Sequence, residues 1–206
     1  MLVLTLVGFG DNLLTDIHQP SNSDPKFIVH GLFSLAWMLL LVLQAALIRS
    51  RNLRLHRKLG LAAAVVAAAV VLSTLYVFAE VWKGWAALEP LFRANRLLLP
   101  GFGLLVWLGY RFRGRPDWHK RLMLLATFLM MEPVLSRAFD PLLVPFMQDW
   151  PESRIDAAFW PFLLIVWSGL FASMFVHDWR TLGRVHPVTG WVFLGFGAIW
   201  PIVLIG

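Results

Sequence analysis

Histidines and a few charged residues carry most of the chemistry that this chain can offer, because its 206 residues include no cysteine. Thiolate metal sites, iron–sulfur clusters and covalently attached haem are therefore excluded. Imidazole pairs remain, and two imidazoles that face each other across a helix bundle can hold a b-type haem. Four of the six histidines fall near predicted helix ends on one side of a membrane: His56, His119, His177 and His186.

These histidines lie close to basic residues that could bind haem propionates. The spacing predicts His56 and His119 as the axial ligands of the haem iron, with His186 or His177 as the substitute. The predicted propionate partners are Arg57, Lys58, Lys120 and Arg121. A second interpretation stays open, because a histidine at a membrane interface can instead contact lipid phosphates or a backbone group at a helix end.

A second set of ionisable residues falls at the opposite helix ends: His30, Glu80, Arg96, Glu132 and Arg137. Ionisable groups at membrane depth cost several kcal/mol unless they are paired, so they mark a functional site or its counter-ions. His30, Ser34 and Gln44 share one helical stripe, and Ser73 and Glu80 share another. We call the predicted set the outer polar seam and expect it between the first, second and fourth spans.

Three interpretations of the outer polar seam compete. The first is a metal site formed by His30, Glu80 and Glu132, the second is a pocket for a quinone or lipid headgroup, and the third is a structural salt-bridge network. Arg96 and Arg137 would repel a cation and favour an anionic or carbonyl-bearing ligand. The headgroup pocket therefore ranks above the metal site.

The elements that must position these residues are transmembrane helices. Hydrophobic residues make up 59% of the chain and charged residues 15%, which is more apolar than a soluble domain. A helix needs roughly 20 apolar residues to cross a bilayer. Six segments meet this need closely enough: residues 27–48, 59–79, 97–112, 122–139, 157–176 and 188–205. Residues 1–26 are expected to form a tail or interfacial segment, and residues 27–206 a single transmembrane helical domain.

The basic residues predict the orientation of these spans. The connections after the first, third and fifth spans hold twelve of the 18 basic residues but only Asp117 and Asp178 among the acidic ones. Such connections face the cytoplasm, so both termini are expected outside. The net charge of +6 is therefore a topology signal and does not indicate nucleic-acid binding. The motifs His56 to Gly60 and His119 to Met123 align, which predicts three tandem helical hairpins.

Together with the stretch from His30 to Gln44, these repeated His-Lys/Arg-Leu helix starts resemble small uncharacterised bacterial multipass membrane families. Some of those look related to cytochrome oxidase assembly proteins or to cytochrome b-type carriers. The resemblance covers roughly the first four spans. It implies a location in the bacterial inner membrane and supports haem b as the cofactor.

We therefore expect a bacterial inner-membrane protein that binds haem b at its cytoplasmic face and serves or assists a respiratory or other redox complex. One alternative is a cofactor-free accessory subunit that packs against other membrane proteins or pigments. Another is a membrane enzyme, or a quinone- or lipid-binding protein, that uses the outer polar seam. The expected partners are membrane lipids and other membrane proteins.

Overall fold

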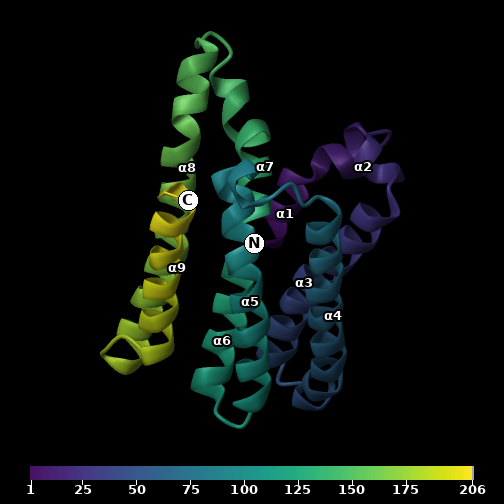
Figure 1. Cartoon of the computed structure of the whole chain (residues 1–206). Coiled ribbons are helices and arrows are strands. Elements are labelled where there is room, and N and C mark those ends of the chain that lie inside the picture. Colours follow the sequence, from purple (N-terminus) through teal and green to yellow (C-terminus); the bar gives the residue numbers. More distant parts are fainter. Residues whose placement is uncertain (206) are drawn as a thin grey trace. The chain divides into compact units, whose positions relative to one another are not determined.

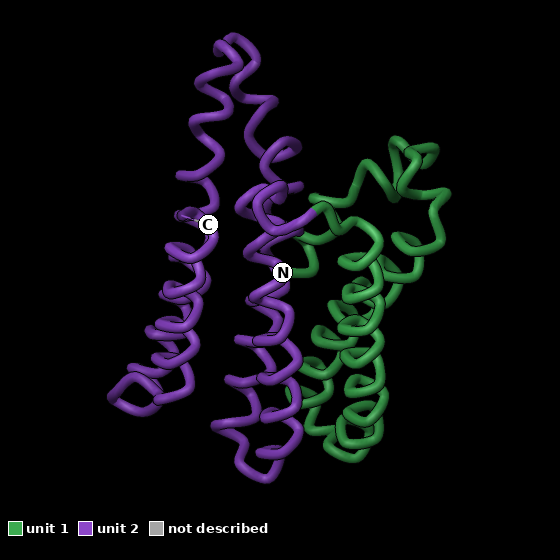
Figure 2. Tube along the Cα trace, viewed as in Figure 1, with its two compact units in different colours: residues 1–83 green, residues 84–206 purple. Residues whose placement is uncertain are grey.

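The fold was analysed in a computed structural model, which describes residues 1–205 and contains only helices, turns and loops over that range (Figure 1). The predicted all-α fold class is confirmed. Contacts between residues divide the chain into two compact units, residues 1–83 and residues 84–206 (Figure 2). Each unit is described by itself below.

Unit 1 is a long helical hairpin that is preceded by short helices. It contains α1 (Leu2–Gly8), a π-helical turn (Asp11–Thr15), α2 (Pro20–Ser23), α3 (Pro25–Arg49) and α4 (Leu53–Glu80). The side chain of Asp24 caps α3 by accepting a hydrogen bond from the backbone N–H of Lys26, and Asn52 caps α4 in the same way. Both α1 and α2 contact α3, so residues 1–26 are largely helical and pack against the hairpin.

The described part of unit 2, residues 84–205, contains the remaining five α-helices. After a short 3-10 turn (Trp85–Ala87) come α5 (Pro90–Arg111), α6 (Pro116–Leu129), α7 (Glu132–Leu143), another 3-10 turn (Val144–Phe146), α8 (Glu152–Leu182) and α9 (Pro187–Ile205). Helices α5 and α6 pair as a hairpin, and α9 contacts both of them, while α7 contacts α8. A proline begins α5, α6 and α9, where its fixed φ and missing N–H are tolerated.

Within residues 1–205, five helices are long and apolar enough to cross a membrane, namely α3, α4, α5, α8 and α9. The count rises to six if α6 and α7 together form one span. The chain is therefore a multipass membrane protein, as its composition predicts. The predicted orientation of the termini and the single domain from residue 27 to residue 206 stay predictions.

The expected fourth span, residues 122–139, is not one continuous helix. Helix α6 ends at Leu129, α7 begins at Glu132, and their axes differ by 59°. Pro133 favours the break, because it has no N–H to donate and its ring would clash with the carbonyl of Leu129 in a continuous helix. Prolines alone do not decide such breaks, since α5 runs through Pro100 without interruption. The break places Glu132 at a helix start.

Helices α8 and α9 are held together by a cluster of rings. Phe171 is 2% exposed and contacts Phe128 of α6 edge to face, and its ring also lies near Phe193 and Phe196 of α9. Trp167 stacks on Phe171 one turn away. The cluster therefore connects α6, α8 and α9 near the middle of α8 and fixes the helices that carry the polar groups at both ends.

Candidate functional site

Glu132 is the most unusual residue of the predicted outer polar seam. It is 1% exposed at the start of α7, where α6 and α7 are bent apart. Its Oε2 accepts a hydrogen bond from the side-chain amide of Asn95 on α5, whereas its Oε1 is buried and has no hydrogen-bond partner among residues 1–205. A buried carboxyl oxygen without a partner carries a desolvation cost of about 1–3 kcal/mol. The site can thus accept one further polar group.

Asn95 was missed by the sequence analysis. It lies in the first turns of α5, next to Ala94, which is fully buried against the neighbouring helices. The pairing of α5 with α6 brings Asn95 to Glu132, because α6 runs back along α5 and ends at the level where α5 begins. The only signal in the sequence was an amide between Arg93 and Arg96 at the start of an apolar segment, and nothing in that stretch identifies its partner.

An apolar cleft lies between the same two helices and α9. Its volume is about 210 Å³. It is lined by Leu97, Gly101, Leu104, Leu105, Leu129, Val192, Gly195, Phe196 and Ile199. Gly101 allows close packing of its wall, because a Cβ there would come within 2.8 Å of Leu129 Cδ1 and would displace the end of that side chain. Leu129 lines the cleft and precedes Glu132 by three residues, so the two features are neighbours along the chain.

In unit 1, the structure brings His30 together with the polar residues of α4. Its Nδ1 lies 3.4 Å from Ser73 Oγ and 3.2 Å from Thr74 Oγ1. Both hydroxyls also contact the carbonyl of Val70, so their protons are directed there and Nδ1–H is the donor to their oxygens. Ser34 Oγ and Gln44 Oε1 are buried on the same stripe of α3 without a hydrogen-bond partner in the described chain. The structure thus brings His30 together with Ser73 of the second predicted stripe.

The other seam residues are less buried. Glu80 is exposed at the end of α4, and Arg137 is exposed on α7. Arg96 is half-buried on α5, and its Nη1 donates to the carbonyl of Phe92. His30 and Glu80 belong to unit 1, whereas Glu132 belongs to unit 2. Residues 1–205 contain no group of three or more His, Asp or Glu side chains arranged to hold a metal ion.

A fully buried ion pair lies at the opposite end of unit 2. Arg121 Nε of α6 donates to Asp178 Oδ1 of α8 at 2.6 Å, and neither side chain is exposed. Arg121 also donates through Nη1 to the carbonyl of Asp117 at 2.9 Å. Asp178 Oδ2 accepts the backbone N–H of His186 at 2.9 Å. Arg121 was predicted to bind a propionate, but the structure places its guanidinium in this internal network.

His186 lies in the loop that joins α8 to α9 and is 7% exposed. Its Nδ1 accepts the backbone N–H of Val188 at 3.2 Å, and its ring contacts Trp118 edge to face at 5.1 Å. Burial lowers the pKa of His186 from the ordinary value of 6.5, the charge of Arg121 lowers it further, and that of Asp178 acts in the opposite sense. Asp117 and Arg184 also act on this ring. The neutral imidazole fits the loop because Nδ1 must be an acceptor.

We expect the folded protein to lose stability as the pH falls below 6.5. The unfolded chain binds a proton at His186 before the folded one does, so the contribution of this residue is complete above the ordinary pKa and is lost on acidification. Thermal unfolding in detergent at pH 7.5 and pH 5.0 measures this loss. His186→Gln should show a smaller difference between the two conditions, and His177→Gln, an exposed control, should behave as the parent protein. Equal differences in all three would contradict the assignment.

The geometry of His119 is compatible with both interpretations of the sequence, as a haem ligand and as a residue that contacts a backbone group at a helix end. Its Nδ1 lies 2.8 Å from the carbonyl oxygen of Gly109, in the last turn of α5. A carbonyl only accepts, so Nδ1 carries the proton and Nε2 carries the lone pair in the neutral ring. The contact satisfies a backbone group at a helix end, as the second interpretation expects. It is also the hydrogen bond that commonly orients a metal-binding histidine.

The remaining predicted haem residues are spread over both units. His56 is half-buried in the first turn of α4, and Arg57 and Lys58 follow it on the exposed surface of unit 1. His177 is exposed on α8 of unit 2. Lys120 is 47% exposed, and its Nζ lies 3.6 Å from Asp117 Oδ1. Of the histidines in unit 2, His119 carries its proton on Nδ1, whereas His186 uses Nδ1 as an acceptor and carries its proton on Nε2.

Comparison with known proteins gives no relative from which a role could be transferred. No family model, curated protein or solved structure matches the chain.

Proposed function

We propose that this multipass membrane protein binds the polar head of a lipid-soluble small molecule, of the quinone or quinol class, at Glu132 and Asn95. The observation that carries the proposal is the buried Glu132 Oε1 at the break between α6 and α7, which lacks a hydrogen-bond partner in the described chain. Broken helices at membrane depth are tolerated where they line a cavity or a site, and a carboxyl group there is a functional candidate by default.

The chemistry of the two side chains supports a carbonyl or hydroxyl headgroup. A protonated carboxyl group donates to a quinone carbonyl, and a carboxylate accepts from a quinol hydroxyl, so the site offers a contact in either redox state. The amide of Asn95 holds Glu132 Oε2 and leaves Oε1 for the ligand. The neighbouring apolar cleft, which Leu129 lines, would receive the ring substituents or the start of the tail.

A titration of the detergent-purified protein with a short-chain alkyl benzoquinone tests the proposal. Eleven tryptophans supply the signal, because bound quinone quenches nearby indole fluorescence. We expect saturable quenching at a stoichiometry of about one quinone per chain, with no quenching by an alkanol of the same tail length. Quenching that rises linearly with quinone concentration, without saturation, would contradict the proposal.

A b-type haem at the predicted cytoplasmic end is the second candidate, and the contact between His119 Nδ1 and Gly109 favours it. A haem would supply one-electron redox chemistry, and in unit 2 His119 is the residue that fits it best. The visible spectrum of the purified protein, oxidised and then reduced with dithionite, tests this candidate. Sharpened reduced bands that disappear in His119→Ala are expected if it holds, and a featureless spectrum from folded protein would exclude it.

A further inference from the structure

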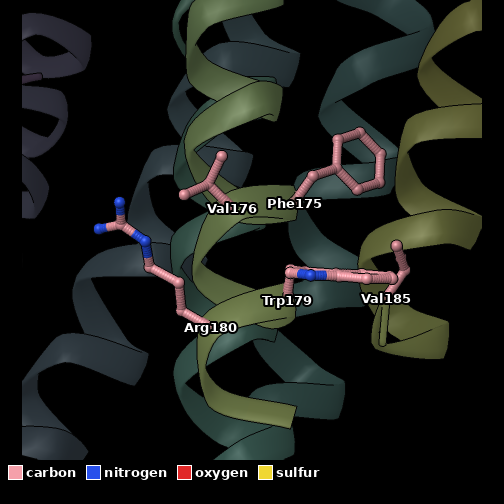
Figure 3. Close-up of a pocket in the computed structure, with 5 residues that line it drawn as sticks. All are labelled: Phe175, Val176, Trp179, Arg180 and Val185. Atoms are coloured by element: carbon pink, nitrogen blue, oxygen red, sulfur yellow. The ribbon is translucent and has the colours of Figure 1, made fainter. Parts of the chain in front are cut away.

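The loop end of α8 carries an open apolar groove that the proposed quinone site does not use. Its volume is about 360 Å³, and it is lined by Phe175, Val176, Trp179, Arg180 and Val185 (Figure 3). Trp179 is 65% exposed and Val185 is 42% exposed. In Figure 3, Phe175 and Trp179 extend toward α9, whereas the guanidinium of Arg180 extends away from α9. The groove therefore has an apolar floor and a cationic edge.

The groove extends along the axis of α8, as an acyl chain beside a membrane-spanning helix would. Phe175 and Val176 lie one turn deeper in α8 than Trp179 and Arg180, which belong to its last turns before Leu182. Tryptophan is enriched at the level of lipid headgroups, and arginine binds phosphate through paired N–H groups. An acyl chain would contact the deeper residues while the headgroup reaches the arginine.

Charge complementarity selects the headgroup. Arg180 and Arg184 are exposed, and neither forms an ion pair within residues 1–205. The nearest acidic residue in the sequence, Asp178, is fully buried and paired with Arg121, so it does not neutralise them. Each basic residue at an anionic membrane surface contributes about 1 kcal/mol of attraction. Arg180 thus lines the groove, and Arg184 directly precedes its lining residue Val185 in the chain; neither arginine has an ion-pair partner within residues 1–205.

We infer that the groove between α8 and the loop that leads to α9 is a binding site for an anionic phospholipid. Its phosphate contacts Arg180 and Arg184, and one acyl chain lies against Phe175, Val176 and Val185. The inference does not rest on the quinone site, because the two sites share no residue.

Native mass spectrometry with phosphatidylglycerol and phosphatidylcholine of equal chain length tests this inference on the full chain. We expect one phosphatidylglycerol to bind preferentially. Its affinity should fall about fivefold for Arg180→Gln or Arg184→Gln and about 25-fold for the double variant. The matched control is Arg154→Gln, an exposed arginine at the opposite end of α8, which should leave the affinity unchanged.

A second variant separates the acyl-chain contact from the charge. Val176→Trp fills the groove, keeps both arginines and should also weaken phosphatidylglycerol binding. Glycerol phosphate, which has the anionic group without a chain, should not bind. Equal binding of the two phospholipids, or an unchanged affinity in the double variant, would overturn the inference. Binding of glycerol phosphate as tight as that of the lipid would assign the site to a soluble phosphate instead.

Discussion

Asp178→Ala is expected to lower the free energy of unfolding by about 3–5 kcal/mol, the largest stability effect that we expect in this chain. The substitution removes the buried anion beside Arg121 and leaves only the exposed Asp117, 3.7 Å from Arg121 Nη1, as a counter-ion. Removing one partner of a buried pair is far more costly than the pair itself is stabilising. It also removes the acceptor for the backbone N–H of His186 in the loop between α8 and α9. Thermal or denaturant unfolding in detergent, followed by circular dichroism, measures the change.

Two variants control this result. Lys120→Ala removes a charge from the neighbouring pair with Asp117, which is largely exposed, and should cost at most about 1 kcal/mol. The double variant Arg121→Met with Asp178→Leu replaces the buried pair by apolar side chains and should recover most of the lost stability. An Asp178→Ala protein as stable as Lys120→Ala would show that the buried pair does not hold α6 to α8.

Glu132→Ala is expected to weaken quinone binding about thirtyfold, because losing a hydrogen bond to a buried group costs about 2 kcal/mol. Glu132→Gln keeps the shape and one donor and should lose less. Glu152→Gln, an exposed carboxylate at the start of α8, is the matched control and should bind as the parent protein does. The fluorescence titration with a short-chain alkyl benzoquinone measures all three.

Substitutions of two glycines of α9 test separately whether the ligand enters the cleft. Gly195 lines the cleft, and a Cβ added there meets no atom within 4 Å, so Gly195→Leu fills the cleft without a clash at its first atom. Gly197 has the same open surroundings but does not line the cleft. Gly195→Leu should lower the affinity for quinone while Gly197→Leu should not. If both variants bind as the parent does, the ligand does not enter the cleft.

Hydropathy was sufficient to predict most of the helical architecture. A continuous apolar segment of about 20 residues has few alternatives to a membrane helix, and five of the six predicted segments lie within single helices, apart from Phe112 at the end of α5. The exception was residues 122–139, where Pro133 interrupts the helix but Pro100 of α5 does not. The difference depends on how neighbouring helices accommodate each proline, which the local sequence does not encode.

The sequence identified buried polar residues more readily than it identified their hydrogen-bond partners. Glu132 was recognised as an ionisable residue at membrane depth, but its partner Asn95 lies 37 residues away on another helix. Arg121 was grouped with the surface cations because four basic residues lie near it in the sequence, from Arg111 to Lys120. Its burial follows from Asp178, 57 residues further along the chain. Hydrogen-bond partners across helices depend on packing, so residue type alone predicts the candidates and not the pairs.

Photo-crosslinking with an azido-benzoquinone, followed by peptide mapping, tests the central claim most directly. The quinone site at Glu132 predicts that the label attaches to residues 95–105 of α5 and to residues 129–135 around the break, and that an excess of unlabelled quinone prevents it. Glu132→Ala should abolish this labelling while the protein remains folded. Label spread evenly over the helices, with no competition by unlabelled quinone, would contradict the claim.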